Sequence, residues 1–310
     1  MRKPEISPEL LAGVWSATPT PLLKTLRIDT ASLKRMVDHH LRLGVKGLLL
    51  AGTCGEGPWV PEREKRLLVQ TVARCAEGRL LLAVQVTDNS AERIFDNIHS
   101  AEEDGADIAV IAPPYFLMNA TPRNLLRLYQ QAIRDSPLPV GLYDRGRFGS
   151  VVIPERVLGK LYEEQNVILI KDSSLMLGHR KIALAAKRKR PELILLNGAE
   201  FNCVEYLEAG FDGLLLGGGI FTGHLARSLM EAVAAGNLTL ARKLQRRMNR
   251  MMYAVYGGKQ LRCWLSGLKW LLVQMGIFRT WNSFLNYPLT PSCVRGIRQV
   301  LKEDADVLLA

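Results

Sequence analysis

The sequence lacks the long hydrophobic runs of membrane proteins and exported proteins. None of its apolar stretches reaches the roughly 20 residues that a transmembrane helix needs. Residues 1–10 carry charges and two prolines, without the apolar run typical of a signal peptide. These two absences predict a cytoplasmic protein that has no membrane partner.

Cysteine is scarce, and its spacing argues against two common kinds of site. The five cysteines are odd in number and far apart, without the paired spacing that zinc sites and redox motifs use. They are Cys54, Cys75, Cys203, Cys263 and Cys293. We expect reduced thiols and no bound metal.

Acidic residues are in deficit, since 30 Asp and Glu stand against 41 Lys and Arg, which gives a net charge of +11. Such an excess can indicate a nucleic-acid partner, and residues 187–190 and 246–247 are basic clusters. The first cluster, however, ends an alanine-rich segment just before Pro191, where cations complement a helix dipole. Aromatic residues are not interleaved with either cluster, so we expect no nucleic-acid partner.

Short, nearly all-apolar runs alternate with longer amphipathic segments along most of the chain. Parallel strands that are covered by helices on both faces have this pattern. Between the runs lie segments with helical spacing, such as residues 62–76, 90–103 and 121–134, the last with Pro122 as its first helical residue. The apolar runs span residues 14–19, 47–51, 80–86, 108–112, 140–143, 167–170, 193–196 and 213–216.

This alternation predicts an α/β fold, a (β/α)8 TIM barrel over residues 1–235. A doubly wound sheet would place a glycine-rich loop after the first strand, whereas this chain has Thr18-Pro19-Thr20-Pro21 there. From about residue 236 the strand signal stops, and helical segments follow at residues 238–253, 261–275 and 292–309. We expect a C-terminal three-helix extension over residues 236–310, packed on the barrel.

The working residues of a barrel enzyme stand at the carboxyl ends of its strands, and Lys171 ends the sixth apolar run. In the dry mouth of a barrel, desolvation disfavours the ammonium form and leaves free amine, which can attack a carbonyl carbon. Tyr143 ends the neighbouring run, where its phenol could transfer protons. Thr53 lies on a glycine-bracketed turn whose hydroxyl and backbone N–H groups could hold a carboxylate. Taken singly, each has a structural alternative, such as a lysine that extends into water or a tyrosine at the barrel rim.

Together, these positions resemble the dihydrodipicolinate synthase / N-acetylneuraminate lyase family of class I, Schiff-base-forming aldolases. The resemblance runs from residues 17–19 through the turn at residues 52–56 and the run from Lys171 to Ser174, and reaches residues 268–289. It implies a barrel with a C-terminal helical extension, a homotetramer built from two tight dimers, and no metal or organic cofactor.

The resemblance also implies roles for individual residues. Lys171 matches the lysine that forms the Schiff base with a 2-oxo acid, most simply pyruvate, and Tyr143 matches the general acid/base beside it. Thr53 matches the hydroxyl residue of a proton relay, and Tyr115 matches the relay tyrosine that reaches into the adjacent subunit. The turn at Thr53 and Cys54 would bind the pyruvate carboxylate.

Several positions depart from the family pattern. Cys54 replaces a second hydroxyl residue, and the synthase motif Tyr-Asn-x-Pro-x-Arg reads Tyr143-Asp144-Arg145-Gly146-Arg147 here. An arginine is present but displaced, so either Arg147 or Arg145 could bind the carboxylate of a second substrate. We also expect Gly198 and Gly217, which follow the seventh and eighth runs, to line the substrate site.

These features favour a lyase or aldolase that joins or separates a 2-oxo acid and an aldehyde or sugar-acid partner. One alternative is an authentic 4-hydroxy-tetrahydrodipicolinate synthase. Two others belong to different classes: a barrel enzyme that binds phosphate through the glycines at residues 217–219, and a non-catalytic sensor of a small acid.

Overall fold

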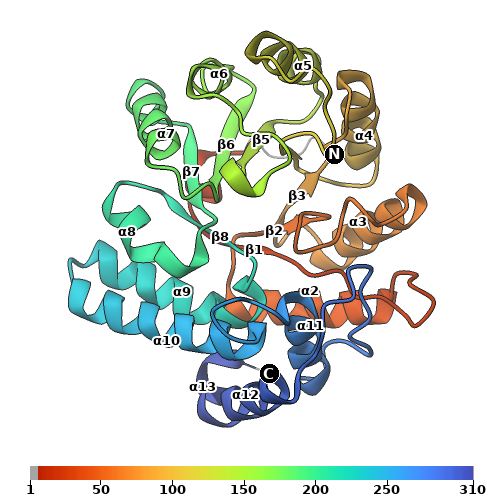
Figure 1. The fold of residues 1–310 in the computed structure, drawn as a ribbon, viewed down its shortest axis with the longest axis vertical. Coiled ribbons are helices and arrows are strands. Elements are labelled where there is room, and N and C mark those ends of the chain that lie inside the picture. Colours follow the sequence, from red (N-terminus) through yellow and green to blue (C-terminus); the bar gives the residue numbers. More distant parts are fainter. Residues whose placement is uncertain (1–5, 310) are drawn as a thin grey trace.

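Eight parallel strands close into a barrel in the computed structural model, which describes residues 6–309 (Figure 1). The strands follow one another around the barrel in chain order, and β8 closes the barrel by pairing with β1. The (β/α)8 TIM barrel is thereby confirmed. The strands are β1 (Gly13–Ala17), β2 (Gly47–Leu50), β3 (Leu81–Gln85), β4 (Ile108–Ile111), β5 (Val140–Asp144), β6 (Val167–Asp172), β7 (Ile194–Asn197) and β8 (Gly213–Leu216).

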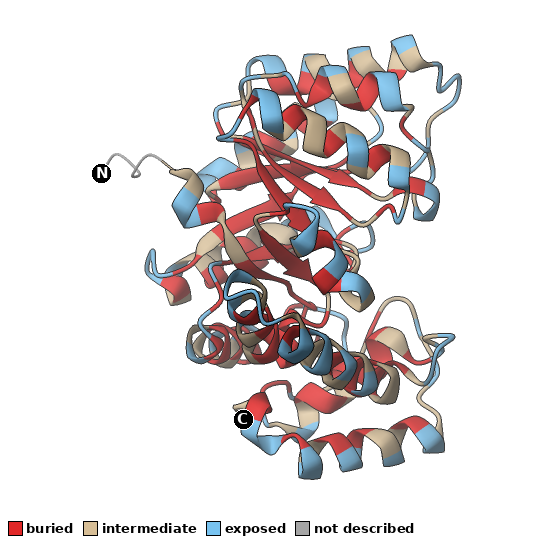
Figure 2. Cartoon of the chain, turned by 90° about the vertical axis from the view of Figure 1, so that its left-hand side faces the viewer, coloured by how far each residue is buried: buried red, intermediate tan, exposed pale blue. Residues whose placement is uncertain are grey.

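A ring of helices covers the barrel, with buried inner faces and exposed outer faces (Figure 2). A short helix, α1 (Pro8–Leu11), precedes the first strand and had no clear sequence signal. The helices between and after the strands are α2 (Thr30–Leu43), α3 (Glu62–Ala76), α4 (Ala91–Glu103), α5 (Pro122–Arg134), α6 (Glu155–Leu161), α7 (Leu177–Lys189), α8 (Cys203–Glu208) and α9 (Gly219–Ala234). Two short 3₁₀ turns, η1 (Gly146–Phe148) and η2 (Glu200–Asn202), follow β5 and β7.

Helix ends agree with the sequence where a capping residue marks them. The Thr121 side chain accepts a hydrogen bond from the N–H of Asn124, and Pro122 is the first residue of α5, as predicted. The Ser90 side chain likewise accepts from the N–H of Arg93 at the start of α4. These local contacts explain why the boundaries of both helices could be predicted closely.

The sixth strand is longer than its apolar run. We expected it to end at Ile170, but β6 continues through Lys171 and Asp172 because Tyr143 pairs with Lys171 and Asp144 pairs with Asp172 in the β5–β6 register. The lysine is therefore part of the barrel wall and does not lie on the following loop.

The C-terminal extension contains four helices, where we expected three. They are α10 (Leu238–Tyr256), α11 (Trp264–Gln274), α12 (Pro291–Glu303) and α13 (Ala305–Leu308). The last predicted helix is interrupted at Asp304, whose buried carboxylate accepts hydrogen bonds from Arg247 (2.8 Å) and Arg250 (2.6 Å) of α10. The extension packs on α9 through α10 and α13, below the barrel in the view of Figure 1. The segment after α11 contacts α2 through hydrogen bonds from Arg35 to the Ile277 carbonyl oxygen and from the Arg279 N–H to Ser32.

The basic cluster at residues 187–190 has a structural role. Lys187 to Lys189 form the last turn of α7, as expected from the helix dipole. The Arg190 guanidinium turns back and donates hydrogen bonds to the carbonyl oxygens of Tyr162, Glu164 and Val167. Within residues 6–309, no helix is both long enough and apolar enough to span a membrane.

Candidate active site

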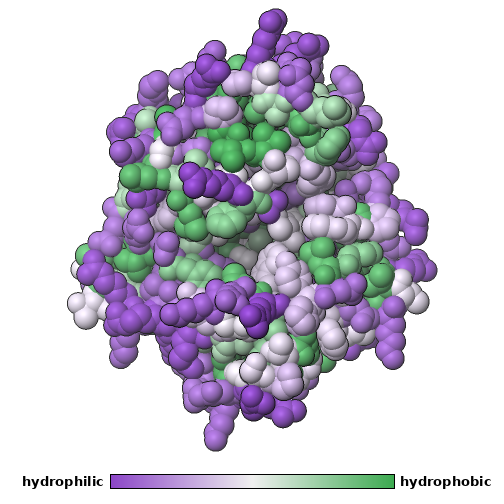
Figure 3. All heavy atoms as spheres, in the orientation of Figure 1, coloured by the Kyte–Doolittle hydropathy of each residue, from purple (hydrophilic) through white to green (hydrophobic). Residues whose placement is uncertain are grey.

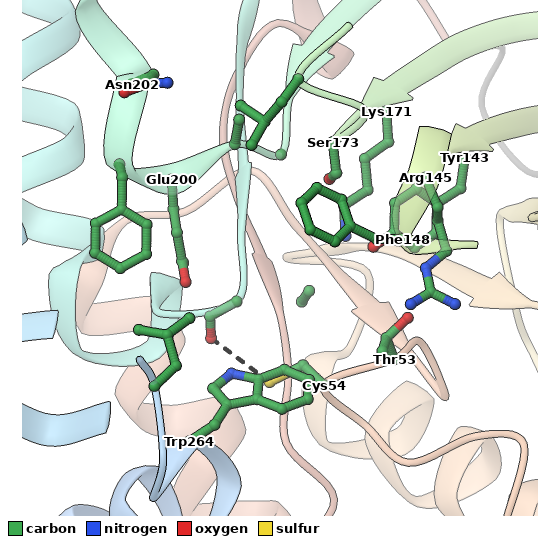
Figure 4. Close-up of a pocket in the computed structure, with 17 residues that line it drawn as sticks. Thr53, Cys54, Tyr143, Arg145, Phe148, Lys171, Ser173, Glu200, Asn202 and Trp264 are labelled. Carbon is green, nitrogen blue, oxygen red and sulfur yellow. Dashed lines mark hydrogen bonds between the residues drawn. The ribbon is translucent and has the colours of Figure 1, made fainter. Parts of the chain in front are cut away.

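A pocket of about 330 Å³ opens at the carboxyl ends of the barrel strands, and Figure 3 shows a hollow near the centre of this face. Side chains from the barrel and from the C-terminal extension form its walls (Figure 4). The lining residues are Ala17, Thr53, Cys54, Tyr143, Arg145, Phe148, Lys171, Ser173, Leu175, Gly198, Ala199, Glu200, Phe201, Asn202, Gly217, Leu261 and Trp264. A cavity of this size holds a small organic ligand.

The Lys171 side chain lies inside this pocket and is 5% exposed. Its Nζ atom lies 4.1 Å from the centre of the Tyr143 ring, and the two residues are partners in the β5–β6 register. The lysine therefore does not extend into bulk water, and its amine faces both the cavity and a phenol.

The Tyr143 phenol is buried among cations and hydrogen-bonding groups. Burial alone would raise its pKa, but the charges of Lys171 and Arg145 and hydrogen bonds with Thr53 and Ser173 outweigh burial and lower the pKa. A phenol whose pKa is lowered can give and take a proton more readily near neutral pH. Thr53, Tyr143 and Lys171 thus lie together, as the sequence predicted.

The turn that carries Thr53 and Cys54 has a fixed backbone. A Cβ atom on Gly57 would lie 1.7 Å from the carbonyl oxygen of Ala51, so only glycine fits there. The Thr20 hydroxyl donates a hydrogen bond of 2.6 Å to the carbonyl oxygen of Gly55, which ties the turn to the segment after β1. Cys54 donates weakly to the carbonyl oxygen of Gly217 (S···O 3.7 Å, dashed in Figure 4), and burial raises its pKa to about 12. Its thiol is neutral and is no rival to Lys171 as a nucleophile.

The two candidate arginines occupy different places. Arg145 lines the pocket, on the same side as Tyr143 and Thr53 (Figure 4). Arg147 lies in the turn η1, is exposed, and is not among the lining residues.

Both predicted glycines line the pocket, and Gly198 leaves space for the lysine. A Cβ atom on Gly198 would lie 2.0 Å from the Ser173 hydroxyl and 2.9 Å from Cε of Lys171. Any larger residue there would displace one of these two side chains. Gly217 meets only ordinary contacts, the nearest being the Glu200 carboxylate at 3.6 Å.

Tyr115 does not line the pocket of its own chain. It follows β4, is 36% exposed, and its hydroxyl accepts a hydrogen bond of 3.1 Å from Gln85. Its expected place in the site of an adjacent subunit stays a prediction.

Sequence reasoning missed Glu200, which faces the pocket across from Lys171 (Figure 4). One carboxylate oxygen accepts a hydrogen bond of 2.7 Å from the N–H of Gly218. Burial raises the pKa of Glu200, although this hydrogen bond and the charge of Lys171 oppose the shift. The available signal was its position just after the seventh apolar run. Because Glu200 takes the N–H of Gly218 and adds negative charge, the glycines at residues 217–219 are poorly suited to bind phosphate.

The C-terminal extension also reaches the site. Trp264 and Leu261 line the pocket, and Lys269 of α11 forms a fully buried ion pair with Glu56 in the active-site turn. The second Glu56 oxygen accepts hydrogen bonds of 2.7 Å from the Ser283 hydroxyl and from the N–H of Phe284. We call these contacts the Glu56–Lys269 brace. Within residues 6–309, no group of three or more His, Cys, Asp or Glu side chains could hold a metal ion.

Known proteins share the sequence pattern and the fold of this chain. The family model of the dihydrodipicolinate synthetase family matches residues 10–301. The 4-hydroxy-tetrahydrodipicolinate synthase of Thermotoga petrophila is 27% identical over 303 residues, which cover 95% of this chain and 99% of that protein. The dihydrodipicolinate synthase structure from Bacteroides thetaiotaomicron is 26% identical, with a TM-score of 0.86 over 96% of this chain and 99% of that one.

A further fold match is YagE, a prophage protein of E. coli K12 solved in complex with pyruvate. It is 20% identical to this chain, with a TM-score of 0.83, and the match covers 96% of this chain and 99% of YagE. With the family model matched over nearly the whole chain, the protein belongs to the dihydrodipicolinate synthetase family, whose members are class I, lysine Schiff-base lyases and synthases.

Proposed function

We propose that this enzyme condenses Lys171 with pyruvate or a related 2-oxo acid, and makes or breaks a carbon–carbon bond to an aldehyde or sugar-acid partner. The observation that carries this proposal is the buried Lys171 amine, 4.1 Å from the centre of the Tyr143 ring and facing a cavity. The nucleophile Lys171 and the proton-transfer group Tyr143 thus lie side by side in a pocket that can hold the substrate.

In the proposed reaction, the neutral Lys171 amine attacks the keto carbon of the 2-oxo acid. The carbonyl oxygen takes up a proton and later leaves as water, which gives an iminium ion. The Tyr143 phenol supplies and recovers these protons. Loss of a proton from the neighbouring carbon gives an enamine, whose carbon attacks the aldehyde carbon, and hydrolysis by water then returns the free lysine. Cleavage follows the same steps in reverse.

Two sets of donors that line the same pocket as Lys171 could bind the carboxylate of the 2-oxo acid. The first is the turn at Thr53 and Cys54, and the second is the Arg145 guanidinium on the same side of the pocket. We favour Arg145 over Arg147 because Arg145 alone of the two lines the cavity. The pyruvate complex of YagE, which has the same fold, supports pyruvate as the probe ligand.

A second candidate, authentic 4-hydroxy-tetrahydrodipicolinate synthesis, is favoured by the names of the curated relatives. The arginine displaced from the synthase motif, at Arg145 and Arg147, argues against this second function. Rates with pyruvate plus aspartate semialdehyde, compared with a panel of pyruvate plus other aldehydes and 2-oxo-3-deoxy acids, separate the two functions.

The test of the common step is reductive trapping. Incubation with pyruvate and borohydride should reduce the iminium and leave a covalent adduct on Lys171, which peptide mass spectrometry locates. Lys171→Ala should abolish the adduct, whereas Lys160→Ala, a matched change at an exposed lysine of α6, should leave it intact. No adduct in the wild-type protein would favour the sensor or phosphate alternatives and overturn the proposal.

A further inference from the structure

A cluster of buried charged side chains lies behind the catalytic wall of the pocket. Asp144 and Asp172 directly follow Tyr143 and Lys171 on β5 and β6, and side chains alternate along a strand. The two carboxylates therefore face the helices, and they are 2% and 1% exposed. They are also partners in the β5–β6 register, so two acidic groups are neighbours in a space without bulk water.

His179 of α7 supplies the positive charge for this cluster. Its Nδ1 atom lies 2.7 Å from Oδ2 of Asp144, and both side chains are 2% exposed. The surrounding titratable groups come from every neighbouring element: Asp172 on β6, Glu155 on α6, and the phenols of Tyr129, Tyr162 and Tyr206.

The imidazole is balanced toward its charged form. Burial favours neutral histidine, but the hydrogen bond and charge of Asp144, together with the charges of Asp172 and Glu155, outweigh burial and raise the pKa of His179. Burial and the charge of Asp144 raise the pKa of Asp172, against two hydrogen bonds from Ser174. Asp144 and His179 thus form the ion pair, and Asp172 is shifted toward neutrality.

This ion pair is connected to the pocket through the turn that carries Arg145. The other Asp144 oxygen, Oδ1, accepts a hydrogen bond of 2.9 Å from the N–H of Gly146. Gly146 has φ of +48°, and a Cβ atom there would lie 2.7 Å from Cβ of Ser174. Ser174 in turn donates its N–H to Oδ1 of Asp172 at 2.8 Å. The residue after Arg145 is therefore held on one side by Asp144 and on the other by the loop after β6.

We propose that the buried Asp144–His179 ion pair positions Arg145 to bind the carboxylate of the 2-oxo acid that condenses with Lys171. The inference rests on the proposed function, since it assigns a role to Arg145 in that pocket. Asp144 and His179 are positioning residues because neither lines the cavity. Loss of the His179 charge leaves the buried Asp144 carboxylate without its partner and so weakens its hold on the turn.

Trapping kinetics with pyruvate test whether the pair acts through Arg145. His179→Gln should raise the pyruvate concentration for half-maximal trapping about fivefold to tenfold, in the range of coupling between residues in contact, with little change in the rate at saturation. Arg145→Gln should raise it as well, and His179→Gln should add nothing in the Arg145→Gln background. His99→Gln, at a half-exposed histidine of α4, is the matched control and should match wild type.

The pH dependence separates this role from a merely structural one. Because the pKa of His179 is raised, its charge is present at low pH and is lost as the pH rises through that pKa. The ratio of half-saturating concentrations, His179→Gln over wild type, should be greatest below that pKa and fall toward one above it. Effects of Lys171 and Tyr143 on pH dependence are common to both proteins and cancel in the ratio.

An NMR titration of the histidine rings reports the ion pair without any activity. The ring signal of His179 is identified as the one missing from the spectrum of His179→Gln. Asp144→Asn keeps an acceptor for the N–H of Gly146 and should lower the pKa of His179. An unchanged titration would overturn the ion pair. The positioning role would be overturned if His179→Gln left the half-saturating pyruvate concentration unchanged, or if its effect added fully to that of Arg145→Gln. In either case, trapping by the wild-type protein would still uphold the proposed function. Absence of wild-type trapping would overturn both.

Discussion

At the scale of single residues, Lys171 and Tyr143 depend on each other's surroundings. The lysine charge helps to lower the pKa of the phenol, and the phenol ring forms one wall of the lysine's place in the pocket. Gly198 makes this arrangement possible because a side chain at that position would collide with Lys171 or Ser173. The residues allowed at these positions are therefore limited both by the reaction and by the space around Lys171.

Removal of one hydroxyl group tests the acid/base role. Tyr143→Phe should slow trapping of pyruvate on Lys171 by about 100- to 10,000-fold, the range for a general acid/base, because the carbinolamine then lacks its proton donor. Addition of borohydride at a series of times after mixing with pyruvate gives the rate of adduct formation on Lys171. Tyr253→Phe, a matched change on α10 outside the cavity, should leave it unchanged. Equal rates for Tyr143→Phe and wild type would remove the phenol from the mechanism.

The sequence predicted some of these residues and missed others for a physical reason. Lys171, Tyr143 and Thr53 stand at strand ends or the next turn, so chain position alone places them at one rim. Glu200 stands in an equivalent place, but its direction depends on the N–H of Gly218, which arrives with β8. The choice between Arg145 and Arg147 depends on the turn η1 and on a positive φ at Gly146, neither of which is visible in the residue pattern.

At the scale of elements, strand lengths depend on pairing more than on apolar character. Lys171 and Asp172 have ionisable side chains, unlike the apolar run before them, yet both belong to β6 because β5 supplies partners for them. The break between α12 and α13 likewise depends on two arginines of α10 that bind Asp304. The pattern of apolar and polar residues in the sequence locates the strands and helices, whereas contacts between distant elements determine where each one ends.

The contact between α11 and the active-site turn allows a test of stability. Lys269→Met should lower the free energy of unfolding by about 3–5 kcal/mol, the cost of leaving a buried charge without its partner, because Glu56 and Lys269 are both fully buried. Burial lowers the pKa of Lys269, against the attraction of Glu56, as expected for a charge kept in the interior by its partner. Urea denaturation gives the value.

The control for this change is an exposed lysine in the same extension. Lys302→Met on α12 should alter the free energy of unfolding by no more than about 0.5 kcal/mol, as surface substitutions do. If Lys269→Met behaved in the same way, the Glu56–Lys269 brace would contribute nothing to stability.

At the scale of the whole molecule, we propose that each site is completed by a second copy of the chain. Tyr115 lies outside the pocket of its own chain, and Phe116 and Met118 beside it are 67% and 77% exposed. Exposed apolar groups of this size are typical of surfaces that contact a partner. We propose the homotetramer of two tight dimers on these grounds.

Subunit mixing tests this arrangement. Tyr115→Phe and Lys171→Ala should each give slow or absent trapping alone, yet co-expression of the two chains should restore it. One site of each mixed dimer then combines an intact Lys171 with an intact Tyr115 from the neighbouring chain. Co-expressed variants that trap no faster than the separate ones, in dimers verified by analytical ultracentrifugation, would contradict a relay between subunits.

The Glu56–Lys269 brace has a consequence for how such a chain can change in evolution. A shortened chain that stopped after α9 would retain Glu56 in the interior and lose Lys269, Ser283 and Phe284, its three donors. Chimeras that exchange the helical tail between relatives must likewise bring a cation that suits residue 56. Changes in the barrel near Glu56 and changes in the helical extension are therefore coupled, since the donors to this carboxylate all come from the extension.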